Sequence, residues 1–307
     1  MNEVRFIGAA EIDASLDWPG LVEALLRFHR TPRARIADLH FAMAGNGLLN
    51  RAAWIEGLGS GLKTVSVFPG NARLDPPRPT VQGVFVLFDD FGSVRAIIDG
   101  AALTRWKTVG DSMLGARLLA RPDSATLLLV GAGTISSTLA RAYPVMFPSL
   151  KRILVWNRTR ARAAELAESV GGEVVEDLAA SVADADIVSC ATISTEPIVR
   201  GRWLKPGAHL DLIGAFKPDM READDDAMRR GRLFVDARDT TLGEIGELIL
   251  PMQAGAITEA DVLGDFYDLA ADASGRRDPG EITVFKNGGG AHLDLMTAAH
   301  ILDRLGS

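Results

Sequence analysis

The fold is decided by residues 127–136, which read LLLVGAGTIS. The apolar run Leu127 to Val130 predicts a buried strand, and the glycines after it predict a tight turn. Residues 135–147 then have the composition of a helix, and a second apolar run, Ile153 to Trp156, follows. This order predicts a strand–helix–strand unit, which is the repeating part of a parallel sheet covered by helices.

The same alternation continues toward the carboxyl end. A helix is expected at 159–170, strands at 187–191, 209–213 and 233–236, and a helical stretch at 221–230. We therefore predict a Rossmann-type doubly wound parallel sheet over residues 121–283.

The first 120 residues have a different pattern. Residues 18–30 are patterned as an amphipathic helix, and residues 64–68 and 81–88 are rich in strand-forming side chains. A last helix, Ala291 to Leu305, has no strand after it, and we expect it to pack on this first region. The predicted fold class is α/β: the Rossmann-type domain plus a mixed α+β domain formed by residues 1–120 and 284–307.

Composition excludes several classes of function. The chain has 307 residues and a net charge of −7, whereas a nucleic-acid binder needs a basic face. The single cysteine, Cys190, fits a reducing compartment, and no apolar run approaches the about 20 residues of a membrane helix. The start has no secretory pattern, and the histidines have no metal-ligand spacing. We expect a cytoplasmic protein of about two domains, without metal, nucleic-acid or membrane partners.

The glycine turn has the form of a dinucleotide site. Glycines let the backbone pass close to a pyrophosphate, and the next helix presents unpaired N–H groups to the anion. A purely structural turn is the alternative, but the position between a strand and a helix favours a cofactor. The expected contacts are Gly131, Gly133, Thr134 and Ile135.

The choice of cofactor depends on the end of the second strand, Asn157-Arg158-Thr159. In NAD-binding proteins an acidic side chain there accepts hydrogen bonds from the adenosine ribose. This chain has no carboxylate at that point, and Arg158 could hold a 2'-phosphate with support from Asn157 and Thr159. The sequence favours NADP over NAD; the alternative is that Arg158 is a solvated residue at a helix start.

Short motifs follow one another in a fixed order along the chain. They are Lys63-Thr64-Val65, Pro69-Gly70-Asn71, Ile98-Asp99-Gly100, Leu103-Thr104, Lys107-Thr108, the glycine turn, Ile213-Gly214-Ala215, Arg221-Glu222-Ala223-Asp224, and Gly290-Ala291 with Asp294. This order resembles the ornithine cyclodeaminase/mu-crystallin family.

The resemblance implies a homodimer in which an N-terminal catalytic domain, completed by the C-terminal helix, closes over a nicotinamide bound to the Rossmann domain. Further cofactor contacts are expected at Thr192, Ile213, Gly214, Asn287 and Gly288. For the last two, a plain loop before the final helix is the alternative.

In that family an arginine after an early proline and a lysine at a strand start hold the substrate carboxylate; these resemble Arg33 and Lys63. Arg35 is a rival for the first role. Lys107 stands where most members have arginine, which keeps the positive charge but loses the planar fork. A 2-imino or 2-oxo acid carries a carboxylate beside its electrophilic carbon, so a guanidinium can orient it, and Lys63 could protonate the nitrogen. The alternative for each residue is a surface cation.

One departure from the family pattern concerns the reaction. The cyclodeaminases carry an aspartate in the loop after the strand that ends at Ile213-Gly214, where this chain has Phe216, which cannot carry a proton. This disfavours ornithine cyclodeamination. Residues 106–108, 111–112 and 214–222 resemble the branch that reduces 1-pyrroline-2-carboxylate to L-proline and 1-piperideine-2-carboxylate to L-pipecolate.

We therefore expect an NAD(P)H-dependent reductase that acts on a cyclic ketimine acid. An alanine-dehydrogenase-like enzyme and a crystallin-like binder of NADPH stay as alternatives. The acidic residues Glu222, Asp224, Asp225 and Asp226 are expected to begin a helix and to face solvent, because negative charge complements the helix dipole.

Overall fold

The computed structural model describes residues 4–271 and 275–306. The chain divides into two compact units: unit 1 is Met1–Lys107 with Gly290–Ser307, and unit 2 is Thr108–Gly289. The boundaries expected at 120/121 and 283/284 differ from this division. The first division falls inside one continuous helix, α3 (Gly100–Leu119), and the strand β14 (Thr283–Lys286) is part of the sheet of unit 2. Sequence periodicity marks neither point.

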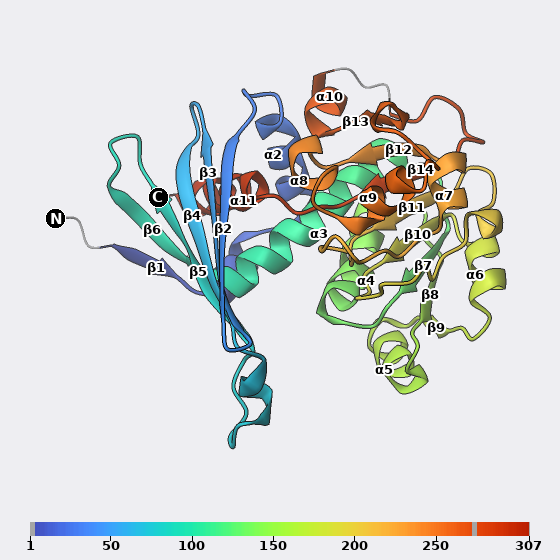
Figure 1. Ribbon diagram of the computed structural model, residues 1–307, viewed down its shortest axis with the longest axis horizontal. Coiled ribbons are helices and arrows are strands. Elements are labelled where there is room, and N and C mark those ends of the chain that lie inside the picture. The colour runs from blue at the N-terminus through green and yellow to red at the C-terminus, as the bar shows by residue number, and fades with distance from the viewer. Residues whose placement is uncertain (1–3, 272–274, 307) are drawn as a thin grey trace. The chain divides into compact units, whose positions relative to one another are not determined.

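Unit 1 contains a six-stranded sheet with the order β1-β6-β5-β4-β3-β2 (Figure 1). β1 is parallel to β6, and the other neighbours are antiparallel. The strands are β1 (Arg5–Ile7), β2 (Arg35–Met43), β3 (Asn46–Ile55), β4 (Gly59–Val67), β5 (Val81–Phe88) and β6 (Val94–Asp99). The helical elements are α1 (Ala9–Ser15), α2 (Trp18–Phe28), η1 (Pro69–Arg73) and α11 (Ala291–Leu305).

The two faces of this sheet have different surroundings. Directly paired residues lie on the same face, so the register Asp38–Arg51–Lys63 puts these three side chains together. α11 packs against β2, β3, β4 and β5, as expected for the last helix, and its side chains are buried from Ala291 to Leu302. The pair Phe41–Leu48 belongs to the opposite face, where apolar side chains are exposed.

Unit 2 contains an eight-stranded sheet with the order β13-β12-β14-β11-β10-β7-β8-β9, and every pairing is parallel. The other strands are β7 (Thr126–Val130), β8 (Arg152–Trp156), β9 (Glu173–Val174), β10 (Ile187–Cys190), β11 (His209–Leu212), β12 (Arg232–Val235) and β13 (Val262–Gly264). The helical elements are α4 (Thr134–Met146), α5 (Arg160–Val170), α6 (Leu178–Asp184), η2 (Gly201–Trp203), α7 (Asp225–Arg230), α8 (Arg238–Thr241), α9 (Gly246–Gln253), η3 (Glu259–Asp261) and α10 (Phe266–Ala271). The predicted doubly wound sheet is confirmed.

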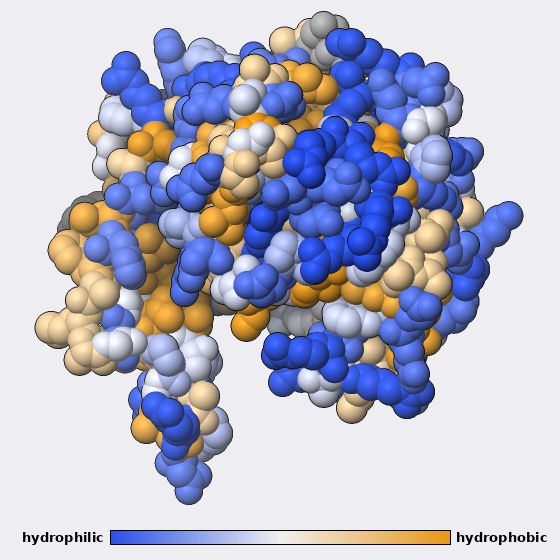
Figure 2. Space-filling model, turned by 45° about the vertical axis from the view of Figure 1, so that its right-hand side comes forward, coloured by the Kyte–Doolittle hydropathy of each residue, from blue (hydrophilic) through white to orange (hydrophobic). Residues whose placement is uncertain are grey.

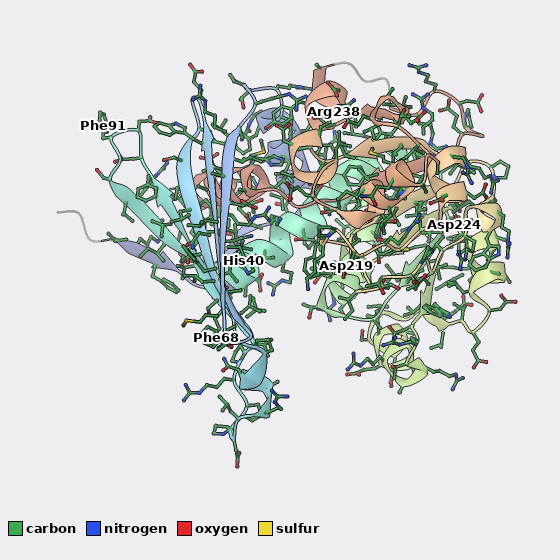
Figure 3. All side chains as sticks on the ribbon, in the orientation of Figure 1. His40, Phe68, Phe91, Asp219, Asp224 and Arg238 are labelled. Carbon is green, nitrogen blue, oxygen red and sulfur yellow. The ribbon has the colours of Figure 1, made fainter. Side chains whose placement is uncertain are left out.

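The helical stretch predicted at 221–230 is correct only in its second half. α7 begins at Asp225, and the side chain of Asp224, labelled in Figure 3, caps it by accepting a hydrogen bond from the N–H of Ala227. Ala223, just before the cap, forms a β-bridge with Val199. Glu222, whose acidic side chain suggested a longer helix, lies outside α7 and accepts hydrogen bonds from Thr192 and Gly214.

Candidate active site

The predicted cofactor residues follow five strands of unit 2 at the same edge of the sheet. Because all the strands are parallel, their carboxyl ends meet at one edge, which is where ligands of doubly wound folds bind. The predicted residues at this edge are Gly131 after β7, Asn157 after β8, Thr192 after β10, Ile213 and Gly214 after β11, and Asn287 after β14.

The two glycines of the turn differ in their surroundings. Gly131 has a φ of +112°, and a Cβ there would lie 2.7 Å from the carbonyl oxygen of Ala191. A Cβ on Gly133 would meet no heavy atom within 4 Å. Gly131 is therefore required by the fold itself, whereas Gly133 leaves open space at the start of α4.

The first turn of α4 offers backbone N–H groups that could bind an anion. Gly133 is the N-cap residue and no side chain caps the helix, so the first N–H groups, at Thr134 and Ile135, have no partner within the helix. Both Gly133 and Thr134 are exposed. These residues fit the pyrophosphate of a dinucleotide.

The segment after β8, residues 157–159, contains the cation Arg158 and no carboxylate. Arg158 is exposed, and the amide of Asn157 donates a hydrogen bond to the carbonyl oxygen of Thr159 at 2.9 Å. This bond joins the two residues on either side of Arg158, directly before α5 (Arg160–Val170).

Glu222 does not face solvent as expected from the acidic cluster. Its side chain is fully buried, and its two oxygens accept hydrogen bonds from Thr192 and from Gly214. The pKa of Glu222 is raised to about 8, mainly by burial and next by the nearby Glu247, while Lys286 opposes the shift. The helix-dipole argument holds for the residues from Asp224 onward only.

Asn287 and Gly288 lie in tightly packed surroundings. The amide of Asn287 donates hydrogen bonds to the carbonyl oxygen of Thr108 at 2.9 Å and to the hydroxyl of Ser112 at 3.0 Å. A Cβ on Gly288 would lie 2.4 Å from the methyl group of Thr241. Both residues thus have a clear structural task, and their contact with a nicotinamide stays a prediction.

Unit 1 contains a buried ion pair that includes the predicted Lys63. Lys63 lies on β4 and is 4% exposed, and its Nζ donates to a carboxylate oxygen of Asp294 at 2.8 Å. Asp294 lies on α11 and is fully buried. Burying both charges is costly unless other polar groups neutralise and satisfy them.

Further cations lie around this pair. Burial by itself would raise the pKa of Asp294, but Lys63, Lys107 and Arg51 together lower it. Lys107 is 3% exposed on α3, and Arg51 forms an ion pair with Asp38 at 2.8 Å. Lys63, Lys107 and Arg51 thus all lie close enough to Asp294 to act on its carboxylate.

The buried His292 lies in the same positive field. Burial lowers its pKa well below the ordinary value, and the charges of His29, Lys107, Arg51 and Arg33 lower it further. His292 is therefore neutral at neutral pH, and its ring lies edge-on to that of His29, with centroids 5.6 Å apart.

The structure distinguishes between the two arginines proposed for the carboxylate. Arg35 pairs with Trp54 across β2 and β3, which places it on the sheet face opposite that of Lys63. Arg33 precedes β2 in a loop, is exposed, and is close enough to act on the pKa of His292. Arg33 thus belongs with the cation cluster, and Arg35 does not.

Sequence reasoning gave no role to Arg51, His292 or Asp294. Arg51 could have been found only by predicting the hairpin of β3 and β4, whose register sets it opposite Lys63. His292 and Asp294 stand two residues apart on an otherwise apolar helix, and that placement of polar side chains was the available signal.

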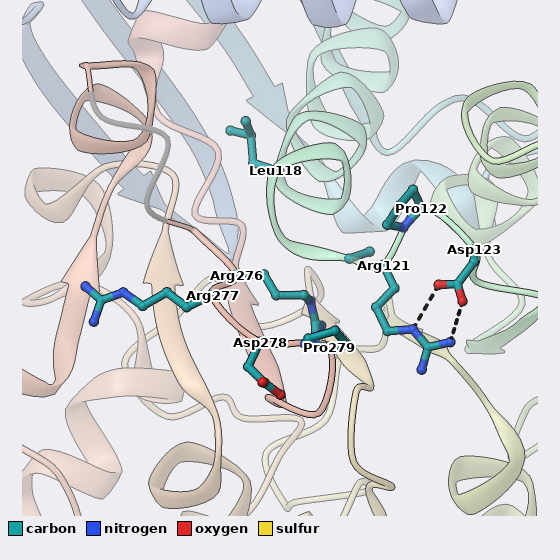
Figure 4. A pocket seen from close by; sticks show the side chains of 9 residues that line it. Leu118, Arg121, Pro122, Asp123, Arg276, Arg277, Asp278 and Pro279 are labelled. Carbon is teal, nitrogen blue, oxygen red and sulfur yellow. Dashed lines mark hydrogen bonds and ion pairs between the residues drawn. The ribbon is translucent and has the colours of Figure 1, made fainter.

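A separate pocket lies in unit 2. It has a volume of about 720 Å³, is drawn in Figure 4, and is lined by Leu118 and residues 120–123 and 276–279. These segments precede β7 and β14, so the pocket lies at the amino ends of the strands, away from the glycine turn. Within residues 4–271 and 275–306, no group of three or more His, Cys, Asp or Glu side chains could hold a metal ion. None of the helices in these ranges combines the length and apolar character needed to cross a bilayer.

The sequence profile of the ornithine cyclodeaminase/mu-crystallin family matches residues 41–307. The chain belongs to this family. It is 51% identical over 304 residues to a delta(1)-pyrroline-2-carboxylate reductase of Paracoccus denitrificans, with 97% of this chain and 96% of that protein covered. It is 34% identical to the ketimine reductase mu-crystallin of Mus musculus, over 78% of this chain and 74% of that protein.

A solved structure agrees in fold over nearly the whole chain. The delta(1)-pyrroline-2-carboxylate reductase of Thermococcus litoralis, in complex with NADH and L-proline, superposes with a TM-score of 0.88 at 25% identity. The match covers 98% of this chain and 97% of that one. The predicted fold and family are therefore both confirmed.

Proposed function

We propose that this member of the family is an NAD(P)H-dependent reductase of cyclic ketimine acids, which converts 1-pyrroline-2-carboxylate to L-proline and its six-membered homologue to L-pipecolate. The observation that carries the proposal is the buried Lys63–Asp294 pair, with Lys107 and Arg51 close enough to lower the pKa of Asp294. Such a cluster suits a small substrate with one carboxylate. The reductase from Paracoccus denitrificans, at 51% identity, supports the same substrate class.

The residues of unit 1 bind and orient the substrate in this proposal. Arg33, Lys63 and Lys107 hold the carboxylate, which fixes the imine carbon beside it. The C=N bond becomes a single bond when hydride arrives at carbon and a proton arrives at nitrogen. Lys63, or a water molecule, gives that proton, and Asp294 orients the Lys63 ammonium through the 2.8 Å hydrogen bond.

The residues of unit 2 bind the dinucleotide. The N–H groups at the start of α4 hold the pyrophosphate, Gly133 gives the space for it, and Arg158 favours NADP through its 2'-phosphate. When bound, a reduced nicotinamide supplies the hydride. The preference for NADP over NAD is supported by the exposed Arg158 and by the lack of a carboxylate at 157–159.

We also propose that the enzyme is a homodimer formed through the uncovered face of the sheet in unit 1. Helix α11 covers only the face of Lys63, whereas the opposite face exposes large apolar side chains. In Figure 2 apolar residues gather on the surface above the projecting segment that holds η1. The exposed side chains of this face include Leu39 (53%), Phe41 (56%), Met43 (82%), Leu48 (41%) and Trp54 (66%). An apolar patch of this kind is typical of a protein–protein interface.

The dimer is tested by replacing Trp54 with glutamate, which would bury a charge in the interface. Analytical ultracentrifugation should give a dimer for the wild type and a monomer for Trp54→Glu. A wild type that sediments as a monomer would refute this assembly. The cytoplasmic location stays a prediction from sequence.

The reaction is tested by following NADPH and NADH absorbance with three substrate sets. We expect oxidation with 1-pyrroline-2-carboxylate and slower or no oxidation with pyruvate plus ammonia. L-ornithine should yield no proline, since Phe216 supplies no proton carrier. Turnover with pyruvate and ammonia alone, or proline formed from ornithine, would overturn the proposal.

A further inference from the structure

One buried carboxylate joins the two loops that follow β10 and β11. Oε1 of Glu222 accepts hydrogen bonds from the backbone N–H and from the hydroxyl of Thr192, at 2.7 and 2.8 Å. Oε2 accepts a hydrogen bond from the backbone N–H of Gly214 at 2.6 Å. A single side chain thus sets the position of one loop against the other.

Glu222 is itself fixed in place from both sides. The carboxylate of Glu247, at the first turn of α9, accepts hydrogen bonds from the N–H groups of Glu222 and Ala223 at 2.7 and 3.0 Å. The carbonyl oxygen of Glu222 accepts from the N–H groups of Ile198 and Val199. The segment that presents the carboxylate therefore has little freedom to move.

The loops joined by Glu222 are also in close contact with each other and with the glycine turn. A Cβ on Gly214 would lie 1.8 Å from the carbonyl oxygen of Thr192, so only glycine fits there. A Cβ on Gly131 would lie 3.3 Å from the methyl carbon of Thr192. Thr192 thus lies between the turn and the Gly214 loop at the carboxyl edge of the sheet.

The charges of this arrangement are costly for a purely structural link. Glu222 and Glu247 are both fully buried, and burial raises the pKa of each. Lys286, also fully buried, opposes these shifts, and its Nζ donates to the carbonyl oxygen of Leu212 at 3.0 Å. Two neighbouring buried carboxylates cost stability that an apolar contact between the loops would not. A role of these carboxylates in function, rather than in stability, would explain why they are present.

We propose that Glu222 is a positioning residue for the nicotinamide half of the cofactor, an inference that rests on the proposed function. A doubly wound sheet consists of two mononucleotide-binding halves that meet at the strand after which the glycine turn lies. The turn and β8 serve the adenosine half, so the loops after β10 and β11 serve the other. By fixing Thr192 against Gly214, Glu222 sets where the nicotinamide ring lies and how its hydride faces the substrate.

The test compares each dinucleotide with its analogue that lacks only the nicotinamide ring. NADPH is compared with 2'-phospho-ADP-ribose, and NADH with ADP-ribose, by fluorescence titration and by calorimetry without substrate. In Glu222→Gln the amide NH₂ cannot accept the hydrogen bonds that a carboxylate oxygen accepts. We expect dinucleotide binding about tenfold weaker, binding of the ring-free analogues within about twofold of wild type, a lower kcat, and an unchanged KM for the imine.

The matched control is Asp224→Ala, which removes the cap of α7 on the same segment. Asp224 contacts Arg200 and Gly201, at the far end of the segment after β10, and its contacts do not include Thr192 or Gly214. This variant should lower the unfolding temperature and leave all four affinities unchanged. Equal weakening of dinucleotide and ring-free analogue by Glu222→Gln, or no weakening, would overturn the proposal. If that variant does not fold, Thr192→Val decides: the loss of one hydroxyl donor should weaken dinucleotide binding alone. A wild type that binds neither dinucleotide overturns the proposed function and this role with it.

Discussion

Replacing each glycine of the turn by alanine separates cofactor binding from the stability of the fold. In Gly133→Ala the new Cβ meets no heavy atom within 4 Å, and the backbone, at φ −98° and ψ −173°, is extended and suits alanine. We expect the free energy of unfolding to stay within about 1 kcal/mol of wild type. In Gly131→Ala the φ of +112° and the 2.7 Å approach to Ala191 predict a loss of about 1–3 kcal/mol or more.

The open space next to Gly133 also predicts how Gly133→Ala changes the affinity for the cofactor. A methyl group there occupies the room through which a pyrophosphate reaches the N–H groups of α4. Losing about two hydrogen bonds to a charged group costs about 3 kcal/mol, or roughly a hundredfold in affinity.

The assay measures NADPH binding by fluorescence titration and unfolding by urea, for wild type and for both variants. Gly133→Ala should lose affinity and keep stability, whereas Gly131→Ala should lose both. If Gly133→Ala binds NADPH as tightly as wild type, the turn does not hold the pyrophosphate. If Gly133→Ala unfolds as easily as Gly131→Ala, the prediction that a methyl group fits at position 133 without strain is wrong.

Three further predictions concern single side chains. Arg158→Glu should weaken NADPH binding about 10- to 100-fold and leave NADH binding unchanged, since it removes one cation and adds a repelling charge; an unchanged preference in a calorimetric titration contradicts the assignment. Lys63→Met should lower kcat/KM for 1-pyrroline-2-carboxylate about 10- to 100-fold without changing the Kd of NADPH, whereas Arg35→Met, on the other face of the sheet, should behave as wild type in steady-state kinetics. Burial and the charge of Arg276 lower the pKa of His209 from 6.5 to about 3. Below pH 6.5 the unfolded chain therefore binds a proton at this histidine before the folded chain does. The contribution of neutral His209 to stability is thus complete above pH 6.5 and is lost as the pH falls toward 3. The free energies of unfolding from urea titrations at pH 7 and pH 5 should differ by about 2 kcal/mol in wild type and by less in His209→Gln, and equal differences would rule out this histidine as a cause.

The parallel sheet could be predicted because its strands are short apolar runs separated by helical patterns. Residues 127–130 and 153–156 lie within strands β7 and β8, and the glycine turn follows β7 as expected. Local sequence determines such elements almost alone. Strand β14 was missed because its four buried residues end in Lys286, and a lysine is rarely fully buried.

The polar parts of the site could not be predicted, because their partners are distant in sequence. Glu222 was assigned to solvent from its acidic neighbours, and only the folded chain brings Thr192 and Gly214 to its oxygens. Lys63 was identified through the family resemblance, but its partner Asp294 was given no role. Arg33 and Arg35 could be distinguished only by the register of β2, β3 and β4.

The pairing of Lys63 with Asp294 also bears on the order in which the protein forms during synthesis. The two residues are separated by 231 positions, and the whole of unit 2 lies between them as one continuous stretch. Unit 2 can therefore complete its sheet on the ribosome before α11, which packs on the sheet of unit 1, has been synthesised. We expect the first hundred or so residues to depend on chaperones during this interval, because long-range contacts form late and leave apolar strands exposed.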